Sequence, residues 1–199
     1  MILGITGGIG SGKSTISKLF SLYGIPVYIA DIESKKLTTT SPLIREKLIN
    51  AFGQKLYDGN TLNKQLFANI IFNDKTKLDL ANKIIHPVVG SHFNEWCSKR
   101  TDYPIIAKES AILFESGFNS LVDKVVMVYT PLEERIERVM KRDRSTRELV
   151  MERIKSQMSD EEKVKKADFV INNDENTSVI PQVEQIIDEL RKKIDNATI

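Results

Sequence analysis

Hydrophobic residues along this chain gather in short runs that alternate with stretches of helical periodicity. Five runs are short and apolar enough to predict buried strands, at residues 2–6, 26–30, 104–107, 124–129 and 168–171. After the first run, Ile16, Leu19 and Phe20 recur at helical spacing, and the segment 179–190 has the same period. Strands that alternate with helices predict an α/β fold, a three-layer core with a five-stranded parallel sheet.

Residues 32–100 interrupt that alternation, because they hold several helical patterns in succession. Ser41-Pro42 predicts the N-cap and first residue of a helix that ends at Gly53, and Asp58-Gly59 predicts a turn. The following patterns predict helices over 62–72, from Asp74 to a break at His86-Pro87, and from there to Lys99. A block of this length exceeds a simple crossover, so we expect an inserted helical subdomain that holds a substrate.

A basic cluster follows the fourth predicted strand. Thr130-Pro131 predicts the N-cap and first residue of a helix. Along that helix Arg135, Arg138 and Arg142 are three and four residues apart, so they share one face. The net charge of the whole chain is only +2, but this local cluster indicates phosphate contacts, with a solvated helix face as the alternative.

Two capping boxes predict the starts of two further helices, at Ser145–Glu148 and Ser159–Glu162. Both helices are short and rich in charged residues. We therefore expect residues 138–166 to form a small helical lid, which would exclude water when it closes.

The segment Gly7-Gly8-Ile9-Gly10-Ser11-Gly12-Lys13-Ser14 fits G-x-x-x-x-G-K-[ST], the phosphate-binding P-loop. It lies between a predicted strand and a predicted helix, which disfavours the alternative of an ordinary Gly-rich turn. Glycines let successive N–H groups face one point, and the helix N-terminus adds partial positive charge there. Lys13 is expected to reach the β- and γ-phosphates, and the Ser14 hydroxyl to bind Mg²⁺. The predicted ATP-binding residues here are Gly8, Ile9, Gly10, Ser11, Gly12, Lys13, Ser14 and Thr15.

Two acidic residues follow predicted strands, at the sheet edge where ligands bind in open α/β folds. Asp31 is expected to orient an acceptor hydroxyl and take its proton, with capping of the next helix as the alternative role. Glu109 is expected to help hold the Mg²⁺. Arg138, Arg142 or Arg147 would move in with the lid and stabilise charge on the transferred phosphate.

Composition and missing motifs narrow the class of function. The chain has 199 residues, of which 41% are hydrophobic and 28% charged, as in a soluble globular protein. No apolar run approaches the roughly 20 residues of a membrane span, and the small net charge disfavours nucleic acid. We expect a cytoplasmic protein that binds neither a membrane nor nucleic acid. Cys97 is expected to be packed and reduced. The D-x-x-G and N-K-x-D signatures of GTPases are missing, which favours a small-metabolite kinase over a nucleotide switch.

Further segments extend the match beyond the loop. They are Gly4-Ile5-Thr6 before it, Gly24-Ile25-Pro26-Val27, His86-Pro87, Ile112-Leu113-Phe114-Glu115, and the succession Arg138, Arg142-Asp143, Gln157, Ala167-Asp168 and Asn173. Together they resemble the dephospho-CoA kinase family over nearly the whole chain. The resemblance implies phosphorylation of the ribose 3′-hydroxyl of dephospho-CoA by ATP, the last step of coenzyme A synthesis, with Mg²⁺ as cofactor.

The resemblance also implies domains and site residues. The P-loop core would comprise 1–31, 101–137 and 167–199, the CoA-substrate-binding insert 32–100, and the lid 138–166. Catalytic roles would fall to Asp31, Lys13, Arg142 and Arg138, and a further ATP contact to Asn173. The acceptor would contact Thr6, Asp31, Lys64, His86, Glu115 and Arg138, although His86 by position alone reads as a helix-end histidine. Expected partners are ATP and dephospho-CoA, in a monomer or weak homo-oligomer.

The chain departs from the family pattern at three places. Ile29-Ala30-Asp31 stands where the family often has Asp-Ala-Asp, which leaves Asp31 as the base. Lys64 stands where arginine is common, and an ammonium pairs with phosphate without bidentate geometry. Ala111 replaces a usual proline. The alternative is a kinase of nucleoside monophosphates or sugar acids. A nucleoside monophosphate kinase would hold its substrate with arginines after the second strand, and Arg45 is the only arginine between Lys36 and Arg100.

Overall fold

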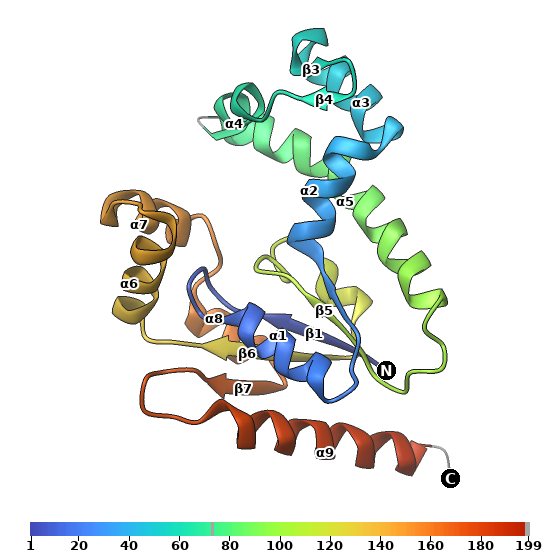
Figure 1. Ribbon diagram of the computed structural model, residues 1–199, viewed down its shortest axis with the longest axis vertical. Coiled ribbons are helices and arrows are strands. Elements are labelled where there is room, and N and C mark those ends of the chain that lie inside the picture. Colours follow the sequence, from blue (N-terminus) through green and yellow to red (C-terminus); the bar gives the residue numbers. More distant parts are fainter. Residues whose placement is uncertain (73, 198–199) are drawn as a thin grey trace. The chain divides into compact units, whose positions relative to one another are not determined.

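The computed structural model describes residues 1–72 and 74–197 of the chain (Figure 1). The contacts divide the chain into two compact units. Met1–Ile29 and Arg100–Ile199 form the sheet unit, and Ala30–Lys99 form the helical unit. Residues 138–166, the expected lid, belong to the sheet unit.

The sheet unit is built on five parallel strands in the order β2-β5-β1-β6-β7. Their bounds are β1 Ile2–Thr6, β2 Val27–Ile29, β5 Ile106–Glu109, β6 Lys124–Tyr129 and β7 Phe169–Asn172. The five predicted strands are confirmed, although β5 starts two residues later than expected and continues through Glu109. β1 lies in the middle of the sheet, so the segment that follows it begins at the centre of the carboxyl edge.

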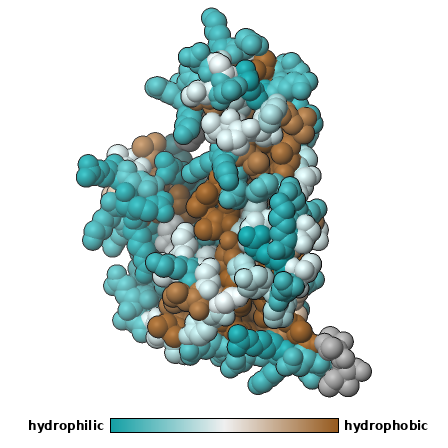
Figure 2. Space-filling view, turned by 45° about the vertical axis from the view of Figure 1, so that its right-hand side comes forward, coloured by the Kyte–Doolittle hydropathy of each residue, from teal (hydrophilic) through white to brown (hydrophobic). Residues whose placement is uncertain are grey.

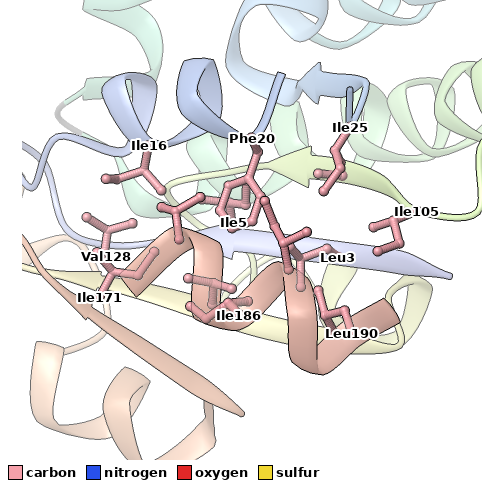
Figure 3. Close-up of a cluster of buried hydrophobic side chains, with 14 residues drawn as sticks. Leu3, Ile5, Ile16, Phe20, Ile25, Ile105, Val128, Ile171, Ile186 and Leu190 are labelled. Atoms are coloured by element: carbon pink, nitrogen blue, oxygen red, sulfur yellow. The ribbon is translucent and has the colours of Figure 1, made fainter. Parts of the chain in front are cut away.

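A hydrophobic core joins this sheet to two helices, α1 (Lys13–Leu22) and α9 (Val179–Ala197). Ile16 and Phe20 of α1 and Ile186 and Leu190 of α9 point toward the strand residue Leu3 and its neighbours (Figure 3). Each such side chain that is fully buried contributes about 1.5–3 kcal/mol. The helical periodicity in both segments therefore correctly predicted a buried face on each helix.

Three helices lie between β6 and β7: α6 (Leu132–Asp143), α7 (Arg147–Lys155) and α8 (Asp160–Lys166). Ile136, Val139 and Val150 are buried between α6 and α7, and Ile9 from the loop after β1 packs against them. Hydrophilic residues cover most of the visible surface of α6 and α7 (Figure 2). The loop after β1 therefore packs against α6 and α7 through apolar contacts.

The predicted helix caps in this region are partly wrong. The box at Ser159–Glu162 is confirmed, with both of its reciprocal hydrogen bonds present. Pro131, not Thr130, is the N-cap of α6, because the Thr130 hydroxyl is buried and donates to two backbone carbonyls instead. The second expected box is absent: Arg144 ends α6 in the left-handed conformation, and α7 starts after Thr146, whose side chain makes no cap hydrogen bond.

The helical unit holds the elements between β2 and β5. They are α2 (Ala30–Thr40), α3 (Pro42–Phe52), the 3-10 helix η1 (Gln54–Leu56), the strands β3 (Tyr57–Asp58) and β4 (Thr61–Leu62), α4 (Lys64–Phe72) and α5 (Lys75–Ser98). The Ser41 cap and the end of α3 at Gly53 are confirmed. The β3–β4 hairpin was not predicted from the sequence. Leu62, expected in the following helix, belongs to β4. A short 3-10 helix, η2 (Phe118–Leu121), lies in the sheet unit.

The expected break at His86-Pro87 is wrong, because α5 continues through Pro87. A proline inside a helix costs about 3 kcal/mol, since one backbone hydrogen bond is lost and the ring crowds the preceding turn. Ala81, Ile85, Val89 and Phe93 recur every four residues and are all buried, so one continuous face of α5 packs on both sides of the proline. That burial outweighs the local cost.

Candidate functional site

Hydrogen bonds hold three carbonyl groups of the loop between β1 and α1, those of Gly8, Ile9 and Ser11. Lys13 Nζ donates to Gly8 O at 3.1 Å, and Arg135 Nε donates to Ile9 O at 3.0 Å. Ser11 O accepts from Thr130 Oγ at 3.1 Å and from Asn173 Nδ2 at 2.8 Å. A loop of this kind at a helix N-terminus directs backbone amides and partial positive charge toward an anion, which would lie here at the start of α1.

Glycine is required at three positions of this loop. Gly10 and Gly12 have φ values of 81° and 85°, in the left-handed region that favours glycine. A Cβ atom on Gly8 would lie 2.5 Å from the guanidinium carbon of Arg135, and one on Gly12 would collide with the Asn173 amide. The motif therefore serves here both a backbone conformation and a close packing of neighbouring side chains.

The predicted magnesium ligands lie in the same unit. Ser14 is exposed in the first turn of α1, and Glu109, 3% exposed, ends β5 in register with Ile5 of β1. No group of three or more metal-ligating side chains occurs among the described residues. Mg²⁺ is usually held by one or two protein oxygens together with phosphates and water, so a hydroxyl and a carboxylate at this edge fit it.

Asn173 supports the loop from behind. Its backbone N–H donates to Tyr129 O at 2.8 Å, continuing the β6–β7 pairing, while its side-chain amide holds Ser11 O. Its own carbonyl accepts from Arg138 Nη1 at 3.0 Å and from Thr130 Oγ at 3.0 Å. A contact of Asn173 with ATP stays a prediction.

The two predicted catalytic arginines differ in their surroundings. Arg138 is half-buried and reaches Asn173 O while it pairs with Glu134 at 3.1 Å. Arg142 is exposed and holds Asp143 through two hydrogen bonds of 2.7 and 3.1 Å. That pairing raises the pKa of Arg142 and lowers the pKa of Asp143. Arg138 is thus connected to the backbone behind the loop, whereas Arg142 faces solvent beside its carboxylate partner.

Two predicted acceptor contacts belong to the sheet unit. The Thr6 hydroxyl, at the end of β1, is buried and makes no hydrogen bond with the described residues. Glu115 Oε1 accepts from Met158 N–H at 2.8 Å and pairs with Lys163 Nζ at 2.9 Å. Lys163 is completely buried and also donates to Ala111 O at 2.8 Å, so the segment after β5 is fixed against α8. Burial lowers the pKa of Lys163, and Glu115 opposes that shift.

The other predicted acceptor residues belong to the helical unit. Asp31 is exposed in the first turn of α2, Lys64 begins α4, and His86 is half-buried within α5. A cavity of about 460 Å³ opens among α2, β4, α4 and α5. It is lined by Ser34, Lys35, Thr38, Thr39, Leu62, Lys64, Phe67, Ala68, Ile71 and Ile85.

Sequence reasoning missed three buried charged residues. Arg135 is 2% exposed and was read as one of a row of arginines on a helix face. Lys163, in one of the short, charged helices predicted from capping boxes, is completely buried. Lys108 on β5 is fully buried, with its Nζ 3.6 Å from the centre of the Phe118 ring. For Arg135 a signal existed: it lies four residues before the apolar Val139, so the two share a face of α6, and that face is packed.

Comparison with known proteins places the chain in a family. The family model described as dephospho-CoA kinase matches residues 1–178. The chain belongs to the dephospho-CoA kinase family. A dephospho-CoA kinase of Bacteroides fragilis is 50% identical over 192 residues, which cover 96% of this chain and 94% of that protein.

Solved structures agree with this membership of the dephospho-CoA kinase family. A dephospho-CoA kinase from Campylobacter jejuni superposes with a TM-score of 0.70 at 29% identity, covering 96% of this chain and 98% of that one. A protein from Thermus thermophilus superposes with a TM-score of 0.82 at 32% identity and covers 97% of both chains. The chain is therefore a kinase with the α/β P-loop fold. None of the described helices is both long and apolar enough to span a bilayer.

Proposed function

We propose that this chain transfers the γ-phosphate of ATP to the ribose 3′-hydroxyl of dephospho-CoA, giving CoA and ADP as the final step of coenzyme A synthesis. The observation that carries the proposal is a P-loop whose backbone is fixed by hydrogen bonds, in a chain that matches the dephospho-CoA kinase family from residue 1 to residue 178. The proposed setting is the cytoplasm, and the proposed form is a monomer or weak homo-oligomer.

In this proposal the loop and Lys13 bind the ATP phosphates. Loop amides and the N-terminus of α1 supply positive charge, and Lys13 reaches the β- and γ-phosphates. Ser14 and Glu109 would hold Mg²⁺, which neutralises charge on the phosphates when bound. Phosphoryl transfer is mainly a matter of position and charge, so most of the catalytic work falls to groups that are fixed before the reaction.

Asp31 is the proposed base of the reaction. Its carboxylate would accept a hydrogen bond from the acceptor hydroxyl, aim that oxygen at the γ-phosphorus, and take the proton as the new bond forms. Its place supports this role, because Asp31 follows β2 by two residues and is exposed in the first turn of α2. Thr6, whose buried hydroxyl has no hydrogen-bond partner in the described part of the chain, and Glu115 are proposed to contact the acceptor from the sheet unit.

The arginines of the proposed lid would stabilise charge on the transferred phosphate. Arg142 would exchange Asp143 for phosphate oxygens, and Arg138 would exchange Glu134. Carboxylate and phosphate present similar pairs of oxygens to the guanidinium fork, so each exchange replaces one charge-assisted pair by another. Residues 138–166 are the proposed lid, in which the part around Arg142 would move while Gln157 and Lys163 keep their contacts with Ile9 and Ala111.

The helical unit is proposed to hold the long acceptor. Dephospho-CoA carries a flexible arm, in which methylene and methyl groups alternate with two amides, and a charged diphosphate. The cavity among α2, β4, α4 and α5 offers Leu62, Phe67 and Ile71 to the arm, while Lys35 and Lys64 supply positive charge at the same cavity. His86 would shape the neighbouring face of α5.

A coupled assay of ADP release with Mg-ATP and a panel of acceptors tests this function. We expect turnover with dephospho-CoA and none above background with AMP, shikimate or gluconate. Mass spectrometry of the product should show one added phosphate, and treatment with a 3′-nucleotidase should remove it. Equal turnover with another acceptor, or none with dephospho-CoA, would reject the proposal. Omission of Mg²⁺ should abolish turnover.

A further inference from the structure

Both peptide groups of Ile9, in the phosphate-binding loop, and its side chain are contacted by residues of the segment from α6 to α8. Its C=O accepts from Arg135 Nε at 3.0 Å, and its N–H donates to Gln157 Oε1 at 3.0 Å. Its side chain packs against the buried cluster between α6 and α7. No other residue of the loop has its N–H, its C=O and its side chain all engaged by that segment, among the contacts of the described residues.

Arg135 is itself fixed by its surroundings. It is 2% exposed, and its guanidinium forms an ion pair with Asp160, in the first turn of α8. The guanidinium lies directly against Gly8, and the Arg135 carbonyl lies against Gly10, because a Cβ atom on either glycine would approach to 2.5 Å. A charge this deeply buried is costly unless it is paired and hydrogen-bonded, so Asp160 and Ile9 O are required partners.

These contacts reduce the conformational freedom of the glycine-rich loop. Glycine-rich backbone has many accessible conformations, and ordering each residue costs about 1–2 kcal/mol. A loop that became ordered only on binding would lose that free energy from its affinity for nucleotide. Fixing the peptide of Ile9 between Gly8 and Gly10 places the following amides before any ligand arrives.

We infer that Arg135 and Gln157 are positioning residues for the bound nucleotide: they fix the Ile9 peptide, and through it the loop amides that receive the phosphates of ATP. Asp160 fixes Arg135 in turn. Neither Arg135 nor Gln157 needs to touch the nucleotide, since both act on the backbone behind it. This inference rests on the P-loop as the ATP site of the proposed function, but not on the identity of the acceptor.

A matched pair of variants at Gln157 tests the inference. Gln157→Met keeps the size of the side chain and removes the acceptor for Ile9 N–H, whereas Gln157→Glu restores an acceptor of the same length. Binding of a fluorescent ATP analogue without acceptor is measured first. We expect Gln157→Met to weaken binding by about fivefold, the scale of one lost hydrogen bond, and Gln157→Glu to recover most of it. Arg135→Lys, which keeps the charge but not the planar fork, should weaken binding by about tenfold.

Steady-state kinetics provide the second readout. The KM for ATP should rise in Gln157→Met and Arg135→Lys, while the KM for dephospho-CoA stays within twofold of wild type. Lys141→Met, an exposed change on the same helix as Arg135, is the control and should alter neither. Wild-type affinity in Gln157→Met, equal loss in Gln157→Met and Gln157→Glu, or parallel changes of both KM values would overturn the inference. If Arg135→Lys does not fold, the Gln157 pair still decides. A chain that binds the ATP analogue but leaves dephospho-CoA unchanged would reject the proposed function and leave this inference standing.

Discussion

Lys163 Nζ lies 2.9 Å from Glu115 Oε1 and connects α8 to the segment that follows β5. The lysine is completely buried and the glutamate side chain is 23% exposed. The same ammonium donates to Ala111 O, and the same carboxylate oxygen accepts from Met158 N–H. One charged pair therefore joins two segments that are distant in the sequence. Each member of the pair also makes a hydrogen bond to the backbone.

Removal of this lysine should destabilise the fold. Lys163→Met keeps the apolar stem but leaves Glu115 with an uncompensated charge and Ala111 O without its donor. We expect the free energy of unfolding to fall by about 3 kcal/mol, the low end for breaking a buried pair, because the carboxylate keeps some contact with water. Urea unfolding followed by circular dichroism measures it. Lys165→Met, exposed on the same helix, is the control and should change stability by less than about 0.5 kcal/mol. An equal loss in both variants would contradict the expectation.

Asp168 should make stability depend on pH. Partial burial raises the pKa of Asp168, but hydrogen bonds from Lys124 and from the Val125 N–H lower it further than burial raises it, and the net shift is downward from 3.8. A carboxyl with a depressed folded pKa stabilises the fold fully above its ordinary pKa and loses that contribution as pH falls through the folded value. The stability difference between wild type and Asp168→Asn should therefore shrink as pH falls below about 4. Urea unfolding of both proteins across that range checks it, and a constant difference would refute the assignment.

Loss of the Asp31 carboxylate should affect chemistry and spare nucleotide binding. Asp31→Asn keeps the size of the side chain but cannot take a proton. We expect kcat to fall by at least about a hundredfold, the lower range for a general acid or base, while the ATP analogue binds as in wild type. Glu33→Gln, in the same first turn of α2, is the control and should keep wild-type kcat. Loss of ATP binding in Asp31→Asn would show instead that Asp31 has a structural role.

The two arginines that share Asp143 should separate a catalytic from a structural role. Arg142 and Arg153 both pair with this carboxylate, at 2.7 and 3.0 Å. If only Arg142 moves to the γ-phosphate, Arg142→Gln should lower kcat by about a thousandfold, and Arg153→Gln should leave it within threefold of wild type. Both variants should lose similar, small amounts of stability, because exposed pairs contribute about 0–1 kcal/mol each. Equal kcat values in the two variants would count against the role of Arg142.

Much of the sheet unit could be predicted from the sequence because its signals are local. Strands buried on both faces appear as apolar runs, and the loop motif has one backbone solution between a strand and a helix. Pro87 shows where local signals fail: its preference to end a helix is real, but tertiary burial of Ala81, Ile85, Val89 and Phe93 overrides it. The β3–β4 hairpin was missed because each of its strands spans only two residues, too few for a pattern.

The support of the loop could not be predicted, since it depends on contacts across long sequence separations. The sequence predicts Thr130 as a helix cap and Arg135 as part of a basic cluster that contacts phosphate or lies on a solvated helix face. In the fold β1, β6 and β7 lie side by side, so the Thr130 hydroxyl donates to Ser11 O and the Arg135 guanidinium donates to Ile9 O. The motif predicts which residues face a phosphate. Which residues hold them in place is a property of the fold.

The central position of β1 has a consequence for the stability of the whole sheet. β1 is bonded to β5 on one side and to β6 on the other, so the strand that carries the phosphate-binding loop cannot detach without opening both ladders. Its amide protons should exchange only through global unfolding, and not through local fluctuations. A nucleotide at the loop is then linked to the unfolding of every strand: at a hundred times its dissociation constant it adds about 2.7 kcal/mol to the free energy of unfolding. Thermal stability and amide exchange in β1 thus become measures of ligand occupancy.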